Sequence, residues 1–265
     1  MRLKEKVILV TGGYTGIGRA IAKKCAQEGA KLVVNGLKAA RGNALVHEIG
    51  DENATAITID ITKADAPQEL VKTAMSRFGK LDAVVNNAAL IASSDISDTT
   101  QDYLQEILAI NTMAPLALIQ AALPYLSKTK GNVLNIGSIN AWCGEPNLLG
   151  YSMSKGALMT MTRNLGDTLF RENGVRINQI NPGWVLTERE IVDKKKQGMK
   201  SDWYKDLPDT FAPAQRIFSP EEIASAAVFL LSDECGPVSG QVLELEQYPM
   251  IGRNPPKNWE GSHRP

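Results

Sequence analysis

Short apolar runs alternate with longer stretches of helical periodicity along most of this chain. The apolar runs have the length and composition of strands that are buried on both faces. They cover residues 6–10, 31–35, 54–59, 82–85, 132–137, 175–180 and 241–245. Helical spacing of apolar residues covers residues 16–28, 65–78, 100–126, 150–170 and 220–231. Strands that alternate with helices predict an α/β fold, in which a doubly wound, Rossmann-type parallel sheet of seven strands carries helices on both faces.

No change of composition and no internal repeat divides the chain, so residues 1–265 are predicted to form a single domain. Residues 188–213 differ from the rest because they are charged and lack a clear period. We expect a partly helical cover over a substrate site, with an ordinary surface insertion as the alternative. The large side chains of this segment are Trp203, Tyr204, Leu207 and Phe211. Residues 247–265, rich in Pro, Gly and charge, are predicted to be a tail that frays or packs on a neighbouring subunit.

Composition and charge exclude several classes of function. The chain has 29 basic and 29 acidic residues, and no long basic stripe, which argues against a nucleic-acid partner. Three widely spaced cysteines and two isolated histidines argue against a disulfide framework, a metal site and a Ser-His-Asp hydrolase. The first apolar segment is too short for a signal peptide or a membrane span. We therefore expect a cytoplasmic protein, without a membrane partner, that acts on a small molecule.

A glycine-rich turn, Thr-Gly-Gly-Tyr-Thr-Gly-Ile-Gly at residues 11–18, joins the first predicted strand to the first predicted helix. Glycines leave backbone N–H groups uncovered, and a helix N-terminus favours an anion, so this turn is suited to a dinucleotide pyrophosphate. The spacing is Gly-x-x-x-Gly-x-Gly. Glycines needed for the geometry of the turn alone are the alternative, which the position directly after a strand disfavours.

The end of the second predicted strand bears on the choice between NAD and NADP. An acid at this point holds the adenosine ribose of NAD in many dinucleotide folds. This chain instead has Gly36, Leu37 and Lys38, followed by Arg41. A 2′-phosphate would meet no negative charge and could pair with Lys38 or Arg41. Both cofactors remain open at this point, with a slight preference for NADP.

A Tyr and a Lys four residues apart, Tyr151 and Lys155, lie in a predicted helix and therefore on one face of it. A neighbouring ammonium lowers the pKa of a phenol, which would make Tyr151 a proton-transfer group. A surface pair without a function is the alternative. Ser138 ends the fifth predicted strand, where the ligands of a parallel sheet bind. Asn111 is a polar residue of poor helix propensity inside a long apolar helix, and it could bend that helix around a water.

These motifs together resemble the short-chain dehydrogenase/reductase family over the chain up to about residue 245. They are Thr11-Gly12-x-x-x-Gly16-Ile17-Gly18, Asn86-Asn87-Ala88, Asn111, Ser138, Tyr151-x-x-x-Lys155 and Pro182-Gly183 with Thr187. The resemblance implies an NAD(P)-dependent oxidoreductase that interconverts a secondary alcohol and a ketone. It also implies a homotetramer in which the two long helices form one interface.

The resemblance further implies a catalytic tetrad of Asn111, Ser138, Tyr151 and Lys155. In this family the Tyr transfers the proton of the substrate oxygen and the Ser hydrogen-bonds that oxygen. The Lys holds the nicotinamide ribose and lowers the Tyr pKa, and the Asn supports a water for proton relay. The cofactor contacts implied are Gly12, Tyr14, Gly16, Ile17, Gly18, Leu37, Lys38, Asp60, Ile61, Asn87, Ala88, Tyr151, Lys155, Pro182, Gly183, Val185 and Thr187.

The chain departs from the family pattern at two further points. Ala89 replaces the last glycine of the Asn-Asn-Ala-Gly motif. The glycine pair expected after the last strand is replaced by Glu246-Gln247-Tyr248-Pro249, so the tail could contribute to a pocket.

The residues between Ser138 and Tyr151 are expected to shape the substrate pocket. The polar and aromatic side chains there and after the sixth strand are Asn140, Trp142, Glu145, Asn147, Trp184 and Glu188. Such a lining suits a hydroxylated substrate, so we hypothesise a sugar, a polyol or a sugar-derived acid. The alternative enzyme is a 3-oxoacyl thioester reductase, for which Lys194, Lys195, Lys196 and Lys200 could dock an acyl carrier. An alternative of another class is a non-catalytic dinucleotide-binding sensor or assembly protein.

Overall fold

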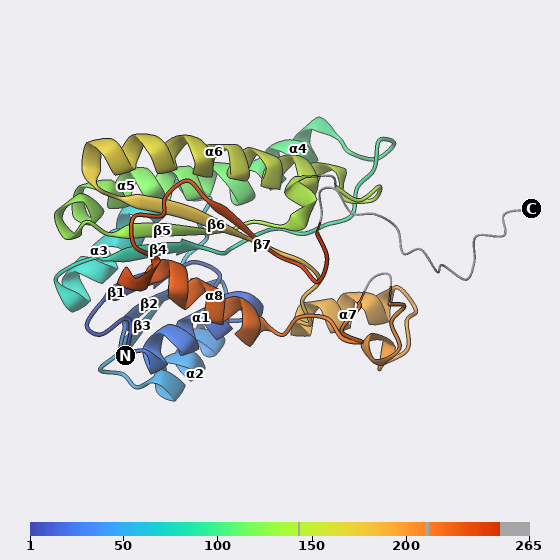
Figure 1. The fold of residues 1–265 in the computed structure, drawn as a ribbon, viewed down its shortest axis with the longest axis horizontal. Coiled ribbons are helices and arrows are strands. Elements are labelled where there is room, and N and C mark those ends of the chain that lie inside the picture. The colour runs from blue at the N-terminus through green and yellow to red at the C-terminus, as the bar shows by residue number, and fades with distance from the viewer. Residues whose placement is uncertain (143, 210–211, 250–265) are drawn as a thin grey trace, which may run out of the picture.

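Seven parallel strands form one sheet, in a computed structural model that describes residues 1–142, 144–209 and 212–249 (Figure 1). The strand order is β3-β2-β1-β4-β5-β6-β7. The strands are β1 (Val7–Val10), β2 (Lys31–Gly36), β3 (Ala54–Thr58), β4 (Ala83–Asn86), β5 (Asn132–Ile136), β6 (Arg176–Pro182) and β7 (Val242–Leu245). Each predicted strand is confirmed to within two residues at either end.

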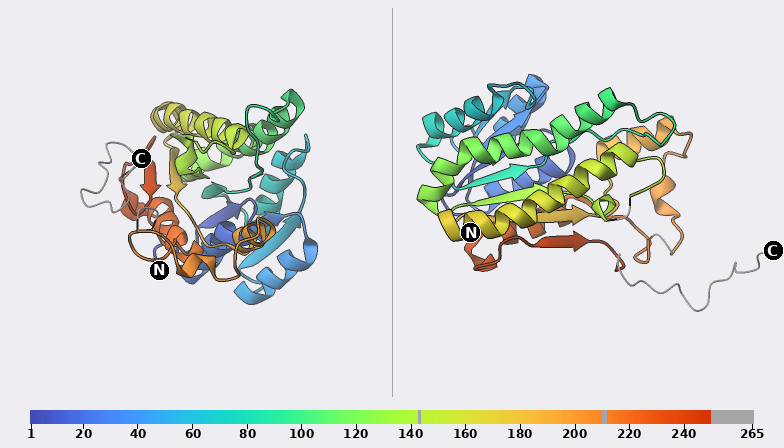
Figure 2. Two further views of the ribbon diagram at one scale, coloured as in Figure 1. Left: turned by 90° about the vertical axis from the view of Figure 1, so that its right-hand side faces the viewer. Right: turned by 90° about the horizontal axis from the view of Figure 1, so that it is seen from above.

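Helices cover both faces of the sheet (Figures 1 and 2). One face carries α1 (Gly16–Gln27), α2 (Ala39–Ile49) and α8 (Pro220–Leu231). The other face carries α3 (Ala66–Phe78), α5 (Ala114–Thr129) and α6 (Leu149–Asn173). α4 (Gln101–Leu108) leads into α5, and α7 (Glu188–Lys196) lies beyond the carboxyl ends of the strands. The doubly wound Rossmann-type fold is confirmed.

Alternating side chains of each central strand divide the core into two layers. In β1, Ile8 and Val10 pack with α1 and α8, whereas Val7 and Leu9 pack with α3 and α5. All four are buried, as expected for a parallel strand covered on both faces. Each such side chain contributes about 1.5–3 kcal/mol through burial, so the two layers together hold the carboxyl ends of the strands in place.

Two helical segments differ from the predictions. The helix predicted over residues 100–126 is continuous but contains a π-helical turn, Ala109–Met113, between α4 and α5. The apolar pattern did not indicate α2, because Gly42 and Leu45 are its only buried residues and leave a weak apolar stripe. The predicted start of α8 is confirmed: the Ser219 hydroxyl accepts from the N–H of Glu222, and the Glu222 carboxylate accepts from the N–H of Ser219.

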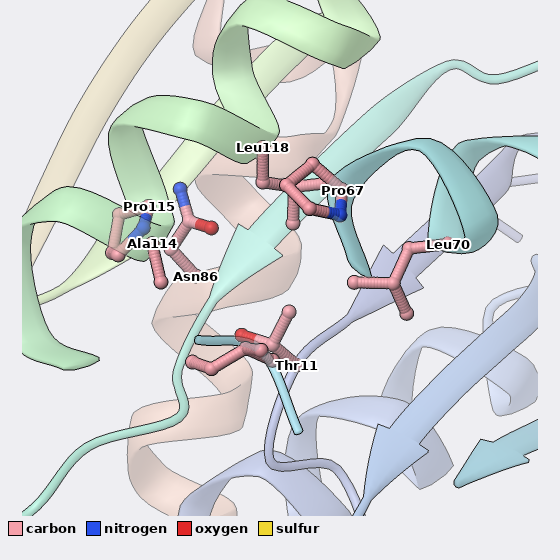
Figure 3. A pocket seen from close by; sticks show the side chains of 8 residues that line it. Thr11, Pro67, Leu70, Asn86, Ala114, Pro115 and Leu118 are labelled. Carbon is pink, nitrogen blue, oxygen red and sulfur yellow. The ribbon is translucent and has the colours of Figure 1, made fainter. Parts of the chain in front are cut away.

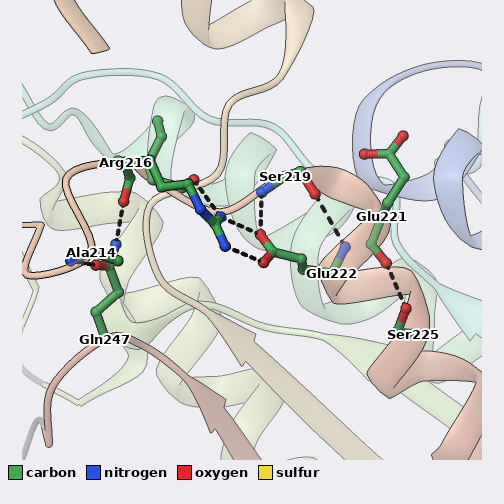
Figure 4. Close-up of polar contacts among 8 residues, drawn as sticks. Ala214, Arg216, Ser219, Glu221, Glu222, Ser225 and Gln247 are labelled. Carbon is green, nitrogen blue, oxygen red and sulfur yellow. Dashed lines mark hydrogen bonds and ion pairs between the residues drawn. The ribbon is translucent and has the colours of Figure 1, made fainter. Parts of the chain in front are cut away.

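The chain that directly follows the cover segment, at Ala214 and Arg216, is fastened to α8 and to the segment after β7 (Figure 4). The Arg216 guanidinium donates two hydrogen bonds to Glu222, at 2.7 and 2.8 Å. The Gln247 carboxamide accepts from the N–H of Ala214 and donates to the carbonyl of Arg216. The segment that replaces the expected glycine pair therefore holds the cover. Residues 250–265 of the predicted tail lie outside the described residues.

The stretch Gln101–Thr129 is long enough to cross a membrane and contains an apolar window of sufficient length. Its apolar residues have another explanation in this fold. Leu118, Ile119 and Leu126 belong to the core layer that α5 shares with α3 and the sheet. The length and apolarity of this stretch are thus those of a core helix.

Candidate active site

The predicted site residues gather at the carboxyl ends of the strands. Five strand ends each carry one of them: Gly12 follows β1, Asp60 follows β3, Asn87 follows β4, Ser138 follows β5 and Gly183 follows β6. β1 and β4 are neighbours in the sheet although β2 and β3 separate them in sequence. From β1 the following strands are added toward one edge of the sheet, and from β4 they are added toward the other edge. Ligands of an open α/β sheet bind at such a switch point.

The glycine turn fits closely against the loop after β4. A Cβ atom at Gly12 would lie 2.8 Å from the Cα of Ala88, and one at Gly18 would lie 2.3 Å from Nδ2 of Asn87. The Thr11 hydroxyl accepts from the N–H groups of Asn87 and Ala88. Glycine is therefore required for this contact, which packs the first turn of α1 against the β4 loop at one side of the site. The cradle fits the pyrophosphate of a dinucleotide.

The Tyr14 side chain packs against β2 and α2. Its side chain is buried against Gly36 and Gly42, where a Cβ atom would lie 2.2 Å and 2.6 Å from the Tyr14 ring. Its hydroxyl donates to the carbonyl of Ile57 at 2.9 Å. The ring thus braces the end of β2, and a phosphate could meet the backbone of Tyr14 but not its phenol.

Leu37, Lys38 and Arg41 are all exposed at the rim that follows β2. No acidic residue lies in the first turn of α2, and no side chain caps it. Asp60, beyond β3, accepts hydrogen bonds from the N–H and hydroxyl of Thr62, which lower the pKa of its carboxyl. The rim therefore presents the positive charges of Lys38 and Arg41 and the uncapped N-terminus of α2. The carboxylate of Asp60 already has hydrogen-bond partners in Thr62.

A pocket opens beside the ends of β1 and β4, between α3 and α5 (Figure 3). Its lining residues are Thr11, Ile61, Pro67, Leu70, Asn86, Ala114, Pro115 and Leu118. Ile61, expected at the adenine, is among them. None of the tetrad residues lines this pocket.

Asn111 sits in the π-helical turn and is buried. Its carboxamide accepts from the N–H of Leu90 at 2.8 Å and donates to the Leu90 carbonyl and to the Ser154 hydroxyl, each at 2.9 Å. The extra residue of a π turn displaces the helix locally, as such turns do at many functional sites. Asn111 thereby ties the β4 loop to the residue that precedes Lys155.

Tyr151, Ser138 and Lys155 converge at the end of β5. The Lys155 ammonium lies 5.7 Å from the centre of the Tyr151 ring and donates to the carbonyl of Ile136 at 2.7 Å. Tyr151 and Lys155 are buried. Burial raises the pKa of Tyr151 to about 12. The hydrogen bond with the Ser138 side chain partly offsets this increase, and the negative charge of Glu145 adds to it. Burial also lowers the pKa of Lys155 to about 7.

Burial, and not the charge of Lys155, is the largest influence on the pKa of Tyr151 in this structure. Burial removes water from both groups, and it disfavours the charged form of each. An ammonium with a pKa near 7 is half neutral at neutral pH, so it exerts a weaker field on the phenol. Tyr151 is consequently a protonated phenol at neutral pH, able to donate a proton.

Residues after β6 close the other side of the cleft. A Cβ atom at Gly183 would lie 2.2 Å from a carboxylate oxygen of Glu246, so the strand end packs on the segment after β7. The Thr187 hydroxyl caps α7 by accepting from the N–H of Glu190. Its methyl group would lie 3.4 Å from a Cβ atom at Gly16. Thr187 therefore reaches across the cleft to the glycine turn, whereas Val185 is buried and pairs with Phe218.

The predicted substrate-pocket residues are only partly brought together. Asn140 is buried, and its N–H donates to the Ser138 hydroxyl at 3.2 Å. Trp142 is exposed, with the Arg163 guanidinium 4.8 Å from its ring centre. Glu145 is exposed but close enough to raise the pKa of Tyr151 by its charge. Asn147 is also exposed, and its carbonyl accepts from the N–H of Ser94.

Trp184 belongs to an aromatic cluster inside the cover. Its ring stacks on Trp203 with centres 4.8 Å apart, and Tyr204 packs edge-on to Trp203. The Trp184 indole N–H donates to Glu190, and the Lys194 ammonium lies over its ring. The cover thus has a small core of its own. Phe211, expected to join it, lies outside the described residues.

Comparison with known proteins agrees with this geometry. A family model described as "Enoyl-(Acyl carrier protein) reductase" matches residues 12–246. This chain belongs to the short-chain dehydrogenase/reductase family. It is accordingly an NAD(P)-dependent oxidoreductase that acts on CH–OH groups.

Three similar proteins illustrate the range of this family. L-fucose dehydrogenase of Mus musculus is 36% identical over 234 residues, which cover 88% of this chain and 84% of that protein. The structure of L-sorbose reductase from Gluconobacter frateurii, complexed with NADPH and L-sorbose, has a TM-score of 0.86 and 27% identity, covering 93% of this chain and 97% of that chain. The 3-ketoacyl-(acyl-carrier-protein) reductase of Brucella melitensis, complexed with NADH, has a TM-score of 0.81 and 28% identity, covering 92% and 97%.

Some residues near the tetrad were not singled out from the sequence. Gln179 and Asn181 of β6 and Thr162 of α6 are completely buried and hydrogen-bonded to one another beneath Ser138. A signal for them existed in the sequence. β6 reads Arg-Ile-Asn-Gln-Ile-Asn-Pro, and polar residues in a strand that is covered on both faces require partners inside the core.

Proposed function

We propose that the protein reduces a carbonyl group of a neutral sugar or oxidises the matching polyol, with Asn111, Ser138, Tyr151 and Lys155 as its catalytic tetrad. The observation that carries the proposal is the convergence of the Ser138 side chain, the buried Tyr151 and the buried Lys155 at the end of β5, in a chain similar to L-fucose dehydrogenase and L-sorbose reductase. The negative charge of Glu145, which contributes to the raised pKa of Tyr151, would repel an anionic substrate. It therefore favours a neutral polyhydroxylated substrate over the sugar-derived acid that the sequence left open.

Each residue has a role that follows from its position. Tyr151, protonated because burial raises its pKa to about 12, donates a proton to the carbonyl oxygen during reduction. The Ser138 hydroxyl, held next to Tyr151, hydrogen-bonds the same oxygen. Asn111 fixes the helix that carries Lys155. The dinucleotide supplies or accepts the hydride when it is bound.

The nucleotide is proposed to lie across the glycine turn. N–H groups at the start of α1 would hold its pyrophosphate, and Asn87, Ala88 and Thr187 would contact its riboses and nicotinamide. The similar structures bind NADPH and NADH. The exposed Lys38 and Arg41, with no acid at the end of β2, favour NADP in this chain.

Reduction of a 3-oxoacyl thioester is the second candidate. The description of the matching family model and the Brucella melitensis reductase favour it. The surface of α7 gives it less support. Lys194 lies over the Trp184 ring and pairs with Glu190, and Lys196 pairs with Asp193, so two of the four lysines predicted to dock a carrier already have acidic partners. A non-catalytic sensor is the weakest candidate, because all four tetrad residues are present and close together.

The assembly and location are also proposals. The fold and family are those of soluble proteins, and we propose that this one is cytoplasmic and acts on a small molecule, without nucleic acid or membrane.

Met113 and Met153, on the two long helices of one face, are exposed and apolar. They support a homotetramer that buries this face, which light scattering on the purified protein would measure. Residues 1–249 would form one catalytic domain with 188–213 as its cover.

A substrate panel tests the proposed function. Ketoses, polyols, sugar acids and 3-oxoacyl thioesters would each be supplied with NADPH and NADH or their oxidised forms, and absorbance of the reduced nicotinamide followed. We expect turnover of neutral ketoses or polyols and weaker turnover of the matching acids. Turnover of acyl thioesters alone would establish the second candidate instead.

A further inference from the structure

A chain of buried amide and hydroxyl groups runs through the core directly beneath the catalytic serine. It begins at Asn86, whose carboxamide donates to Asn135 at 2.9 Å. Asn135 donates to the Thr162 hydroxyl at 2.8 Å, and that hydroxyl lies 2.8 Å from Oε1 of Gln179. These residues are at most 4% exposed and come from β4, β5, α6 and β6.

The chain ends on the backbone of Ser138. The Gln179 carboxamide donates to Oδ1 of Asn181 at 2.7 Å, and the same oxygen accepts from the N–H of Ser138 at 3.1 Å. The Asn181 Nδ2 group lies 3.8 Å from the sulfur of Met159, one helical turn after Lys155. Two donors converge on one oxygen, so the orientation of the Asn181 carboxamide is set.

Gly137 makes this arrangement possible. A Cβ atom there would lie 2.1 Å from Oδ1 of Asn181 and 2.3 Å from Nε2 of Gln179. The backbone that leads into Ser138 therefore rests on these two carboxamides. Buried amides that are fully hydrogen-bonded restrict their neighbours strongly, because breaking one bond leaves a polar group without water.

We infer that Asn181, braced by Gln179, is a positioning residue for the reaction: it holds the backbone N–H of Ser138 so that the serine hydroxyl meets Tyr151 and the substrate oxygen. The inference rests on the tetrad of the proposed function. Asn181 does not touch the reacting atoms. Its hydrogen bond to the tetrad is to the backbone of Ser138, so its loss should alter proton transfer more than cofactor binding.

The test compares three variants of the full chain. Asn181→Leu removes the acceptor, and Gln179→Met removes the brace with little change of volume. Asn178→Leu is the matched control, because Asn178 is equally buried in the same strand but bonds to Val238 and Gln241, away from Ser138. For each variant, kcat, KM, the dissociation constant of the cofactor, thermal stability and the pH profile of alcohol oxidation would be measured.

We expect Asn181→Leu to lower kcat about 10- to 100-fold, the size of effect that follows from about 1 Å of misplacement, with the cofactor dissociation constant within twofold of the parent. Its oxidation profile should move to higher pH, because a displaced Ser138 hydroxyl no longer lowers the pKa of Tyr151. Gln179→Met should lower kcat and move the oxidation profile to higher pH as well, but by smaller amounts. This variant tests the inference if Asn181→Leu does not fold. Asn178→Leu should lose stability with kcat and pH profile kept.

Equal changes of kcat and pH profile in Asn178→Leu and Asn181→Leu would overturn the inference, and so would a parental profile in both Asn181→Leu and Gln179→Met. Failure of the proposed function has a different signature. It would appear as turnover that survives in Tyr151→Phe, whatever the network variants do.

Discussion

The carboxylate of Glu188, the first residue of α7, accepts a hydrogen bond from the backbone N–H of Gly16 at 3.2 Å. Its neighbour Arg189 donates to the carbonyl of Ile91, beyond β4, at 2.8 Å. The start of the cover thus bonds to both walls of the cleft. Gly16 is the first residue of α1, so Glu188 occupies the anion position that the proposed pyrophosphate would need.

Glu188→Gln should therefore strengthen cofactor binding. The Glu188 carboxylate and the pyrophosphate would compete for the N-terminus of α1. The repulsion between two unit charges about 4 Å apart in water is about 1 kcal/mol, so removing the Glu188 charge should lower the dissociation constant roughly fivefold. Fluorescence titration with NADPH and NADH would measure this. Glu221→Gln, a charge change in the first turn of α8, serves as the control. An unchanged dissociation constant in Glu188→Gln would show that the carboxylate and the phosphates do not share a position.

Tyr151→Phe should reduce turnover by at least 10³-fold, because it removes the proton donor, and should leave the cofactor dissociation constant within about twofold. Ser138→Ala should cost about 10²-fold, because the phenol remains but one hydrogen bond to the substrate oxygen is lost. Steady-state rates with the best substrate of the panel would measure both. Turnover near the parental rate in Tyr151→Phe is incompatible with the proposed tetrad.

Lys155→Met should inactivate the enzyme and yet stabilise the fold near pH 7. Burial lowers the pKa of Lys155 to about 7 from 10.5. Between these values the unfolded chain holds a proton that the folded chain lacks, so the free energy of unfolding rises with pH across this window. The wild type should gain on the order of 3 kcal/mol from pH 7 to 9.5 relative to Lys155→Met.

Urea denaturation of both proteins at several pH values would measure this difference. Arg163→Met, on the exposed side of the same helix, provides a control for the loss of a cation. Parallel pH dependence of wild type and Lys155→Met would mean that Lys155 is charged and solvated in the folded protein.

Lys38→Ala combined with Arg41→Ala should raise KM for NADP or NADPH about fivefold and change KM for NAD or NADH less than twofold. The 2′-phosphate is the only part of the nucleotide that differs, and two exposed cations contribute on the order of 1 kcal/mol to it. The difference should shrink at high salt. Lys72→Ala, a surface change on α3, controls for net charge. Equal effects on both cofactors would place these cations elsewhere than at the 2′-phosphate.

Much of the fold was predictable because its signals are local. The seven strands follow from short apolar runs, and the start of α8 follows from Ser219 and Glu222, three residues apart. α2 was missed because its apolar stripe is narrow. The π-helical turn at Asn111 was anticipated as a bend, since a polar residue in an apolar helix needs partners. Which partners it found, Leu90 and Ser154, could not be predicted, because they lie 21 and 43 residues away.

The sequence by itself determined the order of strands and helices along the chain, the glycine turn after the first strand and the spacing of the proposed tetrad residues. These depend on periodicity and on spacing within a few residues. The tertiary structure decided that the Tyr14 ring braces β2, that Asn181 holds Ser138, and that the pKa of Tyr151 is raised instead of lowered. The physical reason is burial. Desolvation and buried hydrogen bonds depend on which distant segments exclude water from a group, and no local pattern of residues specifies that.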